Sequence, residues 1–392
     1  MILKNRNFDV VAHIMLSALL AAATTASAQT FTLLHTFTGS EGNPVGSLIL
    51  SNATLYGMTS GRVFKINTDG SSCSNLHSFG GFSGNADGPH AALTLSGTNL
   101  YGMTVQGGAD WGVVFRISTS GGAYTNLHYF NLLETNGEYP YGSLTLANNA
   151  LYGTTFIGGA SNRGTLFRMD INGGGYTNLH AFAGGTNDGA NPMGDLTLSG
   201  TNFYGMTSQG GAANLGVVFR MNTNGTGYTN LHTFTGYPND GAAPPGSLTL
   251  DGSTLYGMTQ QGGTPPHNLG MVFKLNTDGS GYTNLHFFAG GTGDGATPQG
   301  SGALALANGW LYGMTSASGA GSKGTVFRVS TDGSSYTNFH SFAGGTNDGA
   351  YPYGSTLMLN GSTLYGMTYY GGTNNVGGCL RSQIYPRHRH RR

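Results

Sequence analysis

Short apolar runs alternate with polar turns along the chain, and the same unit recurs. In one copy the runs are GSLTL (246–250), TLYGMT (254–259), GMVFKLN (270–276) and GYTNLHFF (281–288). Each run is rich in Val, Leu, Tyr, Phe or Thr and is bounded by Gly, Asn or Asp, which is typical of β-strands joined by tight turns. No stretch has a sustained helical period. The unit therefore predicts a four-stranded antiparallel meander, whose strands are called a, b, c and d in chain order.

The spacing of the unit predicts a β-propeller. The Tyr of the LYG motif in strand b recurs at Tyr56, Tyr101, Tyr152, Tyr204, Tyr256, Tyr312 and Tyr365. A period of about 50 residues is in the range of propeller blades. Strand d first occurs alone at 31–37, and the last copy offers a recognisable a and b only. We therefore expect an all-β, seven-bladed β-propeller of four-stranded antiparallel blades, closed by pairing the N-terminal strand with the C-terminal blade.

Alternation within strand b indicates what the repeated LYGMT does. Successive side chains of a strand point to opposite faces, so Leu255, Gly257 and Thr259 share one face while Tyr256 and Met258 share the other. Both faces of a propeller blade lie against neighbouring blades. We therefore expect Tyr and Met to fill one seam and Gly257 to leave room for packing on the other side.

Strand c is recognisable only six times. After Gly377 the chain reads GCLRSQIYPRHRHRR, which does not resemble the repeat and contains five arginines. The domain prediction is a signal peptide over 1–28, a propeller over 29–378 and an aberrant basic tail over 379–392. A frameshift or a truncation would explain the tail, and the alternative is a basic anchor for an acidic surface.

The N-terminus has the layout of a secretory signal peptide. Lys4 and Arg6 precede an apolar run at 10–23 and a small-residue site at 26–28. This pattern predicts cleavage near Ala28 and a secreted or cell-surface protein. No later run approaches the roughly 20 apolar residues of a membrane helix, so no membrane span is expected after signal cleavage.

The composition of the chain limits which partners and cross-links can be expected. Charged residues make up 8% of the chain and the formal net charge is zero, which argues against a nucleic-acid partner. Two cysteines, Cys73 and Cys379, are too few for a disulfide framework. We expect a monomer with no cofactor and no metal.

The units LYGMTxxGG, GVVFRxNTxG and YTNLHxF, over residues 31–377, resemble the GloVer (Gloeo/Verruco) tandem repeat of exported bacterial proteins. The resemblance implies export, a propeller-like array and, in most cases, a cell-surface or extracellular location. It brings no assigned activity, substrate or catalytic residue. The chain departs from the family plan because it lacks a recognisable C-terminal sorting anchor.

Strand d carries one histidine in each copy. The seven are His35, His77, His128, His180, His232, His286 and His340. A metal site needs three or four converging ligands, whereas one His on the outermost strand of each blade is spread around the rim. We expect a structural role, such as a hydrogen bond from the ring to neighbouring backbone.

The loop from d to a carries one acidic residue in each copy. These are Glu41, Asp87, Glu138, Asp188, Asp240, Asp294 and Asp348. One carboxylate per loop is too few for calcium, which takes six to eight oxygens, and Asp before Gly is typical of a turn residue that caps local backbone N–H groups. The alternative is that Asp188, Asp240, Asp294 and Asp348 ring the mouth of the pore and contact a ligand.

The loops from b to c differ most between copies, from SG at 60–61 to QQGGTPPHNLG at 260–270. They emerge on the same face as the d-to-a loops, and function is often carried by loops on a rigid scaffold. The aromatic residues there that can stack on sugars or pack against a partner protein are Trp111, Tyr139, Tyr141, His267, Tyr351, Tyr353, Tyr369 and Tyr370. The alternative is that Gly-rich loops simply tolerate variation.

Three functions follow from these patterns. The favoured one is a binding or surface-interaction module for carbohydrate or protein. The second is a propeller glycoside hydrolase or polysaccharide lyase that uses acids such as Asp188, Asp240 and Asp294; an enzyme is less favoured because no G-x-S-x-G, H-E-x-x-H or Walker motif is present. The third is a structural cell-surface component without a discrete ligand. Exposed aromatics gathered on one face would indicate binding, and two converging carboxylates would indicate catalysis.

Overall fold

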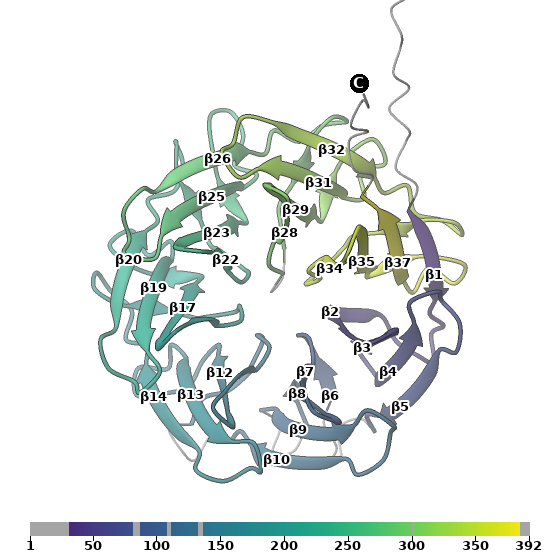
Figure 1. The fold of residues 1–392 in the computed structure, drawn as a ribbon. Helices are drawn as coiled ribbons and strands as arrows, with labels where there is room; N and C mark the ends of the chain where they lie inside the picture. Colours follow the sequence, from purple (N-terminus) through teal and green to yellow (C-terminus); the bar gives the residue numbers. More distant parts are fainter. Residues whose placement is uncertain (1–30, 81–86, 108–110, 132–135, 300–301, 385–392) are drawn as a thin grey trace, which may run out of the picture.

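The computed structural model describes residues 31–80, 87–107, 111–131, 136–299 and 302–384. Every regular element within these ranges is a β-strand, and the strands form seven antiparallel blades around a central axis (Figure 1). The predicted all-β, seven-bladed propeller is confirmed. The predicted signal peptide over 1–28 lies outside the described residues.

The blades, numbered I to VII in chain order, each place strand a nearest the axis and strand d at the rim. Blades I to III consist of β2 (Pro44–Ser51), β3 (Thr54–Thr59), β4 (Arg62–Asn67) and β5 (Ser74–Ser78); β7 (Thr94–Ser96), β8 (Asn99–Gln106), β9 (Val113–Ser118) and β10 (Thr125–Tyr129), with β6 (Asp87–Pro89) also paired to β8; and β11 (Thr145–Ala147), β12 (Ala150–Thr155), β13 (Thr165–Asp170) and β14 (Thr177–Ala181). Blades IV to VII consist of β16 (Thr197–Ser199), β17 (Asn202–Thr207), β19 (Val217–Asn222) and β20 (Thr229–Thr233); β22 (Thr249–Asp251), β23 (Thr254–Thr259), β25 (Met271–Asn276) and β26 (Thr283–Phe287); β28 (Ala305–Ala307), β29 (Trp310–Thr315), β31 (Thr325–Ser330) and β32 (Tyr336–Ser341); and β34 (Met358–Asn360), β35 (Thr363–Thr368), β37 (Gly378–Gln383) and β1 (Thr32–Thr36).

The d-to-a and b-to-c loops share one face, as expected, and in blades IV to VII they form two-stranded pairs with each other, whereas blade III has a single bridge between Glu138 and Ile157. Each pair joins the loop that enters a blade to the b-to-c loop of that blade. The pairs are β15 (Gly189–Ala190) with β18 (Gln209–Gly210), β21 (Gly241–Ala242) with β24 (Gln261–Gly262), β27 (Gly295–Ala296) with β30 (Ala317–Ser318), and β33 (Gly349–Ala350) with β36 (Tyr370–Gly371).

The ring closes through the two ends of the described chain. β1 pairs with β37, and β37 pairs with β35, so that Leu33 lies opposite Leu380 and Met367 opposite Cys379. The boundary at residue 378 is therefore corrected, because residues 378–383 form strand c of blade VII. Backbone hydrogen bonds to strands on both sides impose this pairing even though the side chains depart from the repeat. The origin of the unusual sequence stays a prediction, and residues 385–392 lie outside the described part.

Strand b fills the seams as its alternation predicts. Tyr256 and Met258 pack in one cluster with Leu311 of blade VI. On the opposite face, Leu255 packs with Tyr204 of blade IV. The central residues of each blade are therefore buried from both sides.

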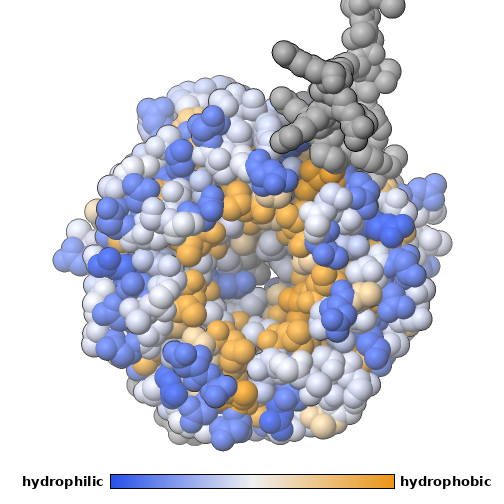
Figure 2. All heavy atoms as spheres, viewed as in Figure 1, coloured by the Kyte–Doolittle hydropathy of each residue, from blue (hydrophilic) through white to orange (hydrophobic). Residues whose placement is uncertain are grey.

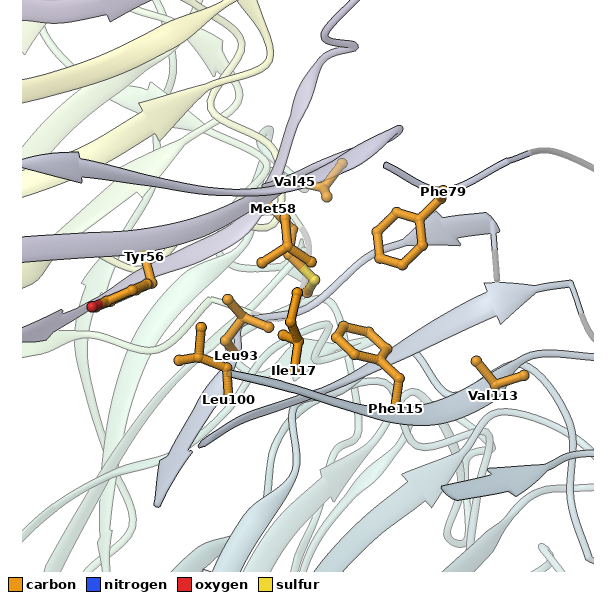
Figure 3. Packing of buried hydrophobic residues seen from close by; sticks show 10 residues of the cluster. Val45, Tyr56, Met58, Phe79, Leu93, Leu100, Val113, Phe115 and Ile117 are labelled. Carbon is orange, nitrogen blue, oxygen red and sulfur yellow. The ribbon is translucent and has the colours of Figure 1, made fainter. Parts of the chain in front are cut away.

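Figure 3 shows the same arrangement in the seam between blades I and II, where Met58 of β3 lies near Leu93 and Phe115 of blade II. The Gly of LYG makes room for the ring on strand c of its own blade. A Cβ added to Gly102 would lie 2.4 Å from Cζ of Phe115, closer than real atoms approach. Any larger residue at this position would displace the aromatic ring.

The innermost strands are shorter than predicted. The run 246–250 was expected as strand a, but β22 begins at Thr249. The preceding residues bond between blades instead, as when the backbone N–H of Asp195 donates to Oγ of Ser247 at 2.7 Å. A Cβ added to Gly194 would lie 2.0 Å from the carbonyl oxygen of Gly246, so the Gly of Pro-x-Gly permits this close approach near the axis.

The surface separates by polarity. On the face shown in Figure 2, hydrophobic residues gather around the central opening, whereas hydrophilic residues cover the outer part of the ring. Within the described ranges, no helix is long and apolar enough to cross a membrane.

Candidate functional site

A cavity of about 470 Å³ lies where loops of blades VI, VII, I and II meet. Its lining residues are Val45, Ser60, Gly88, Pro89, His90, Gln299, Tyr351, Tyr353, Tyr369 and Tyr370. Most come from b-to-c loops or from d-to-a loops, which the sequence indicated as the variable face. The cavity therefore lies on the loop face, on the side of the ring where the chain closes.

A shortened loop leaves the space for this cavity. The b-to-c loop of blade I consists of Ser60 and Gly61, whereas blade VII carries YYGGTNNVG at the same position. Ser60 lines the cavity together with Tyr369 and Tyr370 of the longer loop. Asn43 fixes the two loops together, because its carbonyl accepts from Ser60 N at 2.8 Å and its Nδ2 donates to the carbonyl of Tyr369 at 2.8 Å.

Four tyrosines form the aromatic part of the lining. The ring centroids are 6.0 Å apart for Tyr351 and Tyr370, 6.2 Å for Tyr353 and Tyr369, and 4.8 Å for Tyr369 and Tyr370. The planes meet at 87°, 69° and 80°, so the rings contact one another by their edges. In the described chain only five large hydrophobic side chains are exposed, and three of them are Tyr351, Tyr353 and Tyr370. Exposed apolar patches on folded proteins are often interaction sites, so this cluster is the candidate site.

The backbone at Tyr351 supports a role for its ring. Its φ is 50°, in the left-handed region, and the same loop position is left-handed in Tyr139, Asn191, Ala243 and Thr297. Asn suits this conformation, and Asn191 also donates from its side chain to a neighbouring carbonyl. Tyr gains nothing from the conformation, which costs on the order of 1 kcal/mol. The turn conformation therefore does not account for a tyrosine at position 351.

Sequence reasoning missed Val45, His90 and Gln299 in the lining. Together with the predicted Tyr353, they occupy the middle position of Pro-x-Gly or its variant Pro-His-Ala. In the seven copies the middle residue is Val, His, Tyr, Met, Pro, Gln and Tyr, and this variation is the signal that could have found them. Tyr141 occupies the same position and contacts His90, with ring centroids 5.2 Å apart, so it extends the aromatic wall.

The cavity is uncharged. None of the described residues that line it is Asp, Glu, Lys or Arg. Burial raises the pKa of Tyr369, with a further rise from Tyr370 and Tyr353, and burial lowers the pKa of His90. At neutral pH the site therefore presents neutral hydroxyls, a neutral imidazole and a carboxamide, which can donate and accept hydrogen bonds.

Besides Tyr141, three of the predicted aromatic residues lie outside the lining. Trp111 and Tyr139 contact each other with ring centroids 5.2 Å apart, and Trp111 also packs against the seam between blades II and III. Trp111 is half-buried, which indicates packing. His267 is exposed on the b-to-c loop of blade V and is not part of the cavity.

Four of the loop acids, Asp188, Asp240, Asp294 and Asp348, contact the rim histidines rather than the mouth of the pore. Asp240 accepts from the backbone N–H groups of Thr235 and Gly241 at 2.8 and 2.7 Å, which is the predicted turn cap. It also contacts Nε2 of His232 at 3.3 Å and accepts from the hydroxyl of Tyr282 in the next blade at 2.6 Å. Asp188, Asp294 and Asp348 contact the histidine of their own outermost strand in the same way. The expected His-to-backbone bond is replaced by a His-to-carboxylate contact, because the d-to-a loop folds back onto strand d.

These contacts keep the carboxylates ionised. Burial alone would raise the pKa of Asp240, but hydrogen bonds from His232, Tyr282 and backbone N–H groups lower it to about 2. The pKa values of Asp188, Asp294 and Asp348 are lowered for the same reasons. Over the described part of the chain, no three His, Cys, Asp or Glu side chains are grouped so that they could hold a metal ion.

The ring of repeats and the variable, aromatic loop face define a repeat β-propeller that presents a small-molecule-sized cavity on a rigid scaffold. The chain belongs to the family of the Gloeobacter/Verrucomicrobia repeat, whose model matches residues 22–214 and 184–380. The resemblance carried by LYGMTxxGG, GVVFRxNTxG and YTNLHxF is confirmed.

Solved structures share the fold. The extracellular domain of BT4673 from B. thetaiotaomicron superimposes with a TM-score of 0.59 at 11% identity, over 90% of this chain and 40% of that one. The oligogalacturonate lyase from Vibrio parahaemolyticus superimposes with a TM-score of 0.58 at 11% identity, over 92% of this chain and 95% of that one. At these identities the likeness shows the fold alone. A search among curated proteins gave no significant match.

Proposed function

We propose that the protein is a binding module that holds a neutral carbohydrate in the loop-face cavity. The observation that carries the proposal is the cluster of exposed tyrosines around an uncharged cavity. Because the rings meet edge to face, their faces remain available to stack on the apolar face of a sugar ring. His90, Gln299 and the tyrosine hydroxyls supply hydrogen bonds for sugar hydroxyls.

The size and chemistry of the cavity favour this ligand over the alternatives. Small-molecule sites have volumes of roughly 300 to 1,000 Å³, and this cavity is within that range at about 470 Å³. A glycosidase needs two carboxylates beside the bond that it breaks, whereas Asp188, Asp240 and Asp294 are bonded at the rim. A flat protein partner would not use a concave site of this size.

The proposed location is outside the cytoplasm. Support comes from Lys4 and Arg6 ahead of the apolar run at 10–23, and from the exported proteins that the repeat resembles. Cleavage near Ala28 would release a monomeric propeller that meets extracellular polysaccharide. Mass spectrometry of the exported protein checks this, and a retained Met1 would contradict it.

A glycan array followed by calorimetry tests the binding function. We expect a neutral oligosaccharide to bind, and Tyr369→Ala to weaken it by about tenfold or more, equivalent to about 1.4 kcal/mol. The matched control is Tyr237→Ala, because Tyr237 is 47% exposed on another d-to-a loop and does not line the cavity. Absence of binding to every neutral glycan, or an equal loss with Tyr237→Ala, would overturn the proposal.

A further inference from the structure

Six of the seven strand-d histidines lie against an aromatic side chain from the next blade. In each case this side chain belongs to the residue four positions before that next blade's own histidine, as Tyr124 precedes His128 and stacks on His77. Centroid distances are 3.7 Å for His77 with Tyr124, 3.9 Å for His128 with Tyr176, 4.2 Å for His180 with Tyr228, 3.6 Å for His232 with Tyr282, 3.6 Å for His286 with Tyr336, and 4.6 Å for His340 with Phe31. In the five tyrosine pairs the planes are within 10° of parallel.

Each of these tyrosines lies in a slot between two rings. Tyr124, for example, has His77 on one face and Phe115 of strand c on the other, with centroids 3.7 and 5.5 Å away. Where the loop acid is Asp240, the tyrosine hydroxyl donates to it at 2.6 Å. The slot therefore holds a phenol ring by stacking on both faces, and in the seam between blades IV and V a carboxylate also binds its polar end.

In the seam between blades VII and I the slot is present, but no aromatic side chain fills it. Cys73 occupies the position of the tyrosine, and a cavity of about 200 Å³ remains beside it. His35, Phe37 and Phe64 line this cavity, and the centroids of Phe37 and Phe64 are 5.0 Å apart. β1, which carries His35, lies beside β4 and β5 of blade I (Figure 1). A cavity of about 150 Å³ is enough to hold benzene.

The polar end of the slot is also present. Nε2 of His35 is buried and makes no hydrogen bond within the described structure, and Oε1 of Glu41 lies 3.8 Å from it. Glu41 accepts from Thr38 and lies 3.5 Å from Arg62, which also lines the cavity. Exposed Ser74 at the edge of the lining leaves the cavity open to solvent.

Other chemistry fits less well. Burial raises the pKa of the Cys73 thiol to about 11, so it stays protonated at neutral pH and is a poor nucleophile. Three metal ligands are not grouped here or elsewhere in the described ranges. The remaining features are two aromatic walls and a carboxylate.

We propose that this slot binds a phenolic ring between His35 and Phe64, with the phenol hydroxyl donating to Glu41. The ring comes from a free phenolic molecule or from a tyrosine side chain of another chain, which present the same chemistry. The site is separate from the loop-face cavity, because the two share no lining residue.

Calorimetry with p-cresol and the full-length protein tests the proposal. We expect one p-cresol to bind and Cys73→Tyr to abolish binding, because the new ring fills the slot. The matched control is Tyr124→Cys, which opens the equivalent slot between blades I and II and should add a second p-cresol. Tyr369→Ala should leave p-cresol binding unchanged, so a failure of the carbohydrate proposal is distinguishable.

Two further arms complete the test. Toluene should bind more weakly than p-cresol, and Glu41→Gln should reduce that difference. A tyrosine-containing peptide that binds as well as p-cresol points to a partner side chain, whereas binding of p-cresol alone points to a free phenol; both support the slot. No p-cresol binding to the wild-type chain, or equal binding to Cys73→Tyr, would overturn it, whether or not Tyr124→Cys folds.

Discussion

The seam between blades IV and V and the seam between blades VII and I use the same repeat positions but differ at the rim. In the first, Tyr282 stacks on His232 and donates to Asp240. In the second, Cys73 replaces the tyrosine and Glu41 replaces the aspartate. The first rim is a closed set of contacts and the second contains a cavity.

The buried centres of the two seams are alike. Tyr365 and Met367 pack with Leu55 and Phe64 between blades VII and I. The positions equivalent to these in blades IV and V form the corresponding cluster. The comparison teaches that the centre of a seam keeps the ring together, whereas the rim can change and acquire a cavity.

Acid should produce the largest effect, because it acts on four rims at once. The pKa values of Asp188, Asp240, Asp294 and Asp348 are lowered from the ordinary 3.8, that of Asp240 to about 2. A pKa that is lower in the folded chain gives stability that is full above about pH 4 and is lost as pH falls through the folded pKa, towards about pH 2. Urea unfolding followed by fluorescence at several pH values measures this. A free energy of unfolding that stays constant below pH 4 would contradict it.

Gly257→Ala should be the most damaging of the substitutions. Its Cβ would lie 2.5 Å from Cζ of Phe273, whereas a Cβ on Gly366 of blade VII meets Leu357 at 3.0 Å and Leu380 at 3.4 Å. Overpacking costs about 1 to 3 kcal/mol, so we expect about 3 kcal/mol for Gly257→Ala and about 1 for Gly366→Ala. Urea unfolding gives both values, and equal losses would show that Leu380 does not relieve the crowding.

Asp240→Asn should cost more than Glu41→Gln. Hydrogen bonds to a charged group contribute about 1.5 to 3 kcal/mol, and Asp240 is 11% exposed where Glu41 is 21%. We expect about 2 kcal/mol for Asp240→Asn and under about 1 for Glu41→Gln, whose ion pairs are longer and partly exposed. Thermal and urea unfolding of both variants measure the difference. A larger loss for Glu41→Gln would reverse the comparison of the two rims.

Ser382→Val should stabilise blade VII by about 1 kcal/mol, the smallest effect. Ser382 is 2% exposed and its hydroxyl makes no hydrogen bond in the described structure, whereas the equivalent residue of blade VI is Val329. The urea midpoint should rise. Val329→Ser is the reciprocal control, and it should lower the midpoint.

Local rules were enough to predict the fold. The alternation in TLYGMT fixed which side chains enter each seam, and the count of strands d, a and b gave seven blades with a shared terminal blade. The seventh strand c was missed because residues 378–383 lack its side-chain pattern. These residues form a strand because they pair with β35 and β1. Pairing between distant segments cannot be predicted from a local sequence pattern.

The site was predicted in part. Tyr351, Tyr353, Tyr369 and Tyr370 were singled out because they lie on variable loops, and they line one cavity. Their meeting with His90 depends on closure of the ring, which brings the start and the end of the repeat together. The turn-capping role of acids such as Asp240 followed from Asp before Gly, but their contact with the strand-d histidines did not, because sequence does not show that the d-to-a loop folds back onto the outermost strand.

Closure through β1 also sets an order on folding. β1 is the first described strand to leave the ribosome, yet its partner β37 is the last, so their contact has the greatest separation along the chain of any strand pair described. Contacts of this separation form slowly. Until β37 is made, β1 has no partner and the repeats form only an open stack. Closure therefore acts as a test of completeness, because a chain that stops before β37 cannot become a ring in this way.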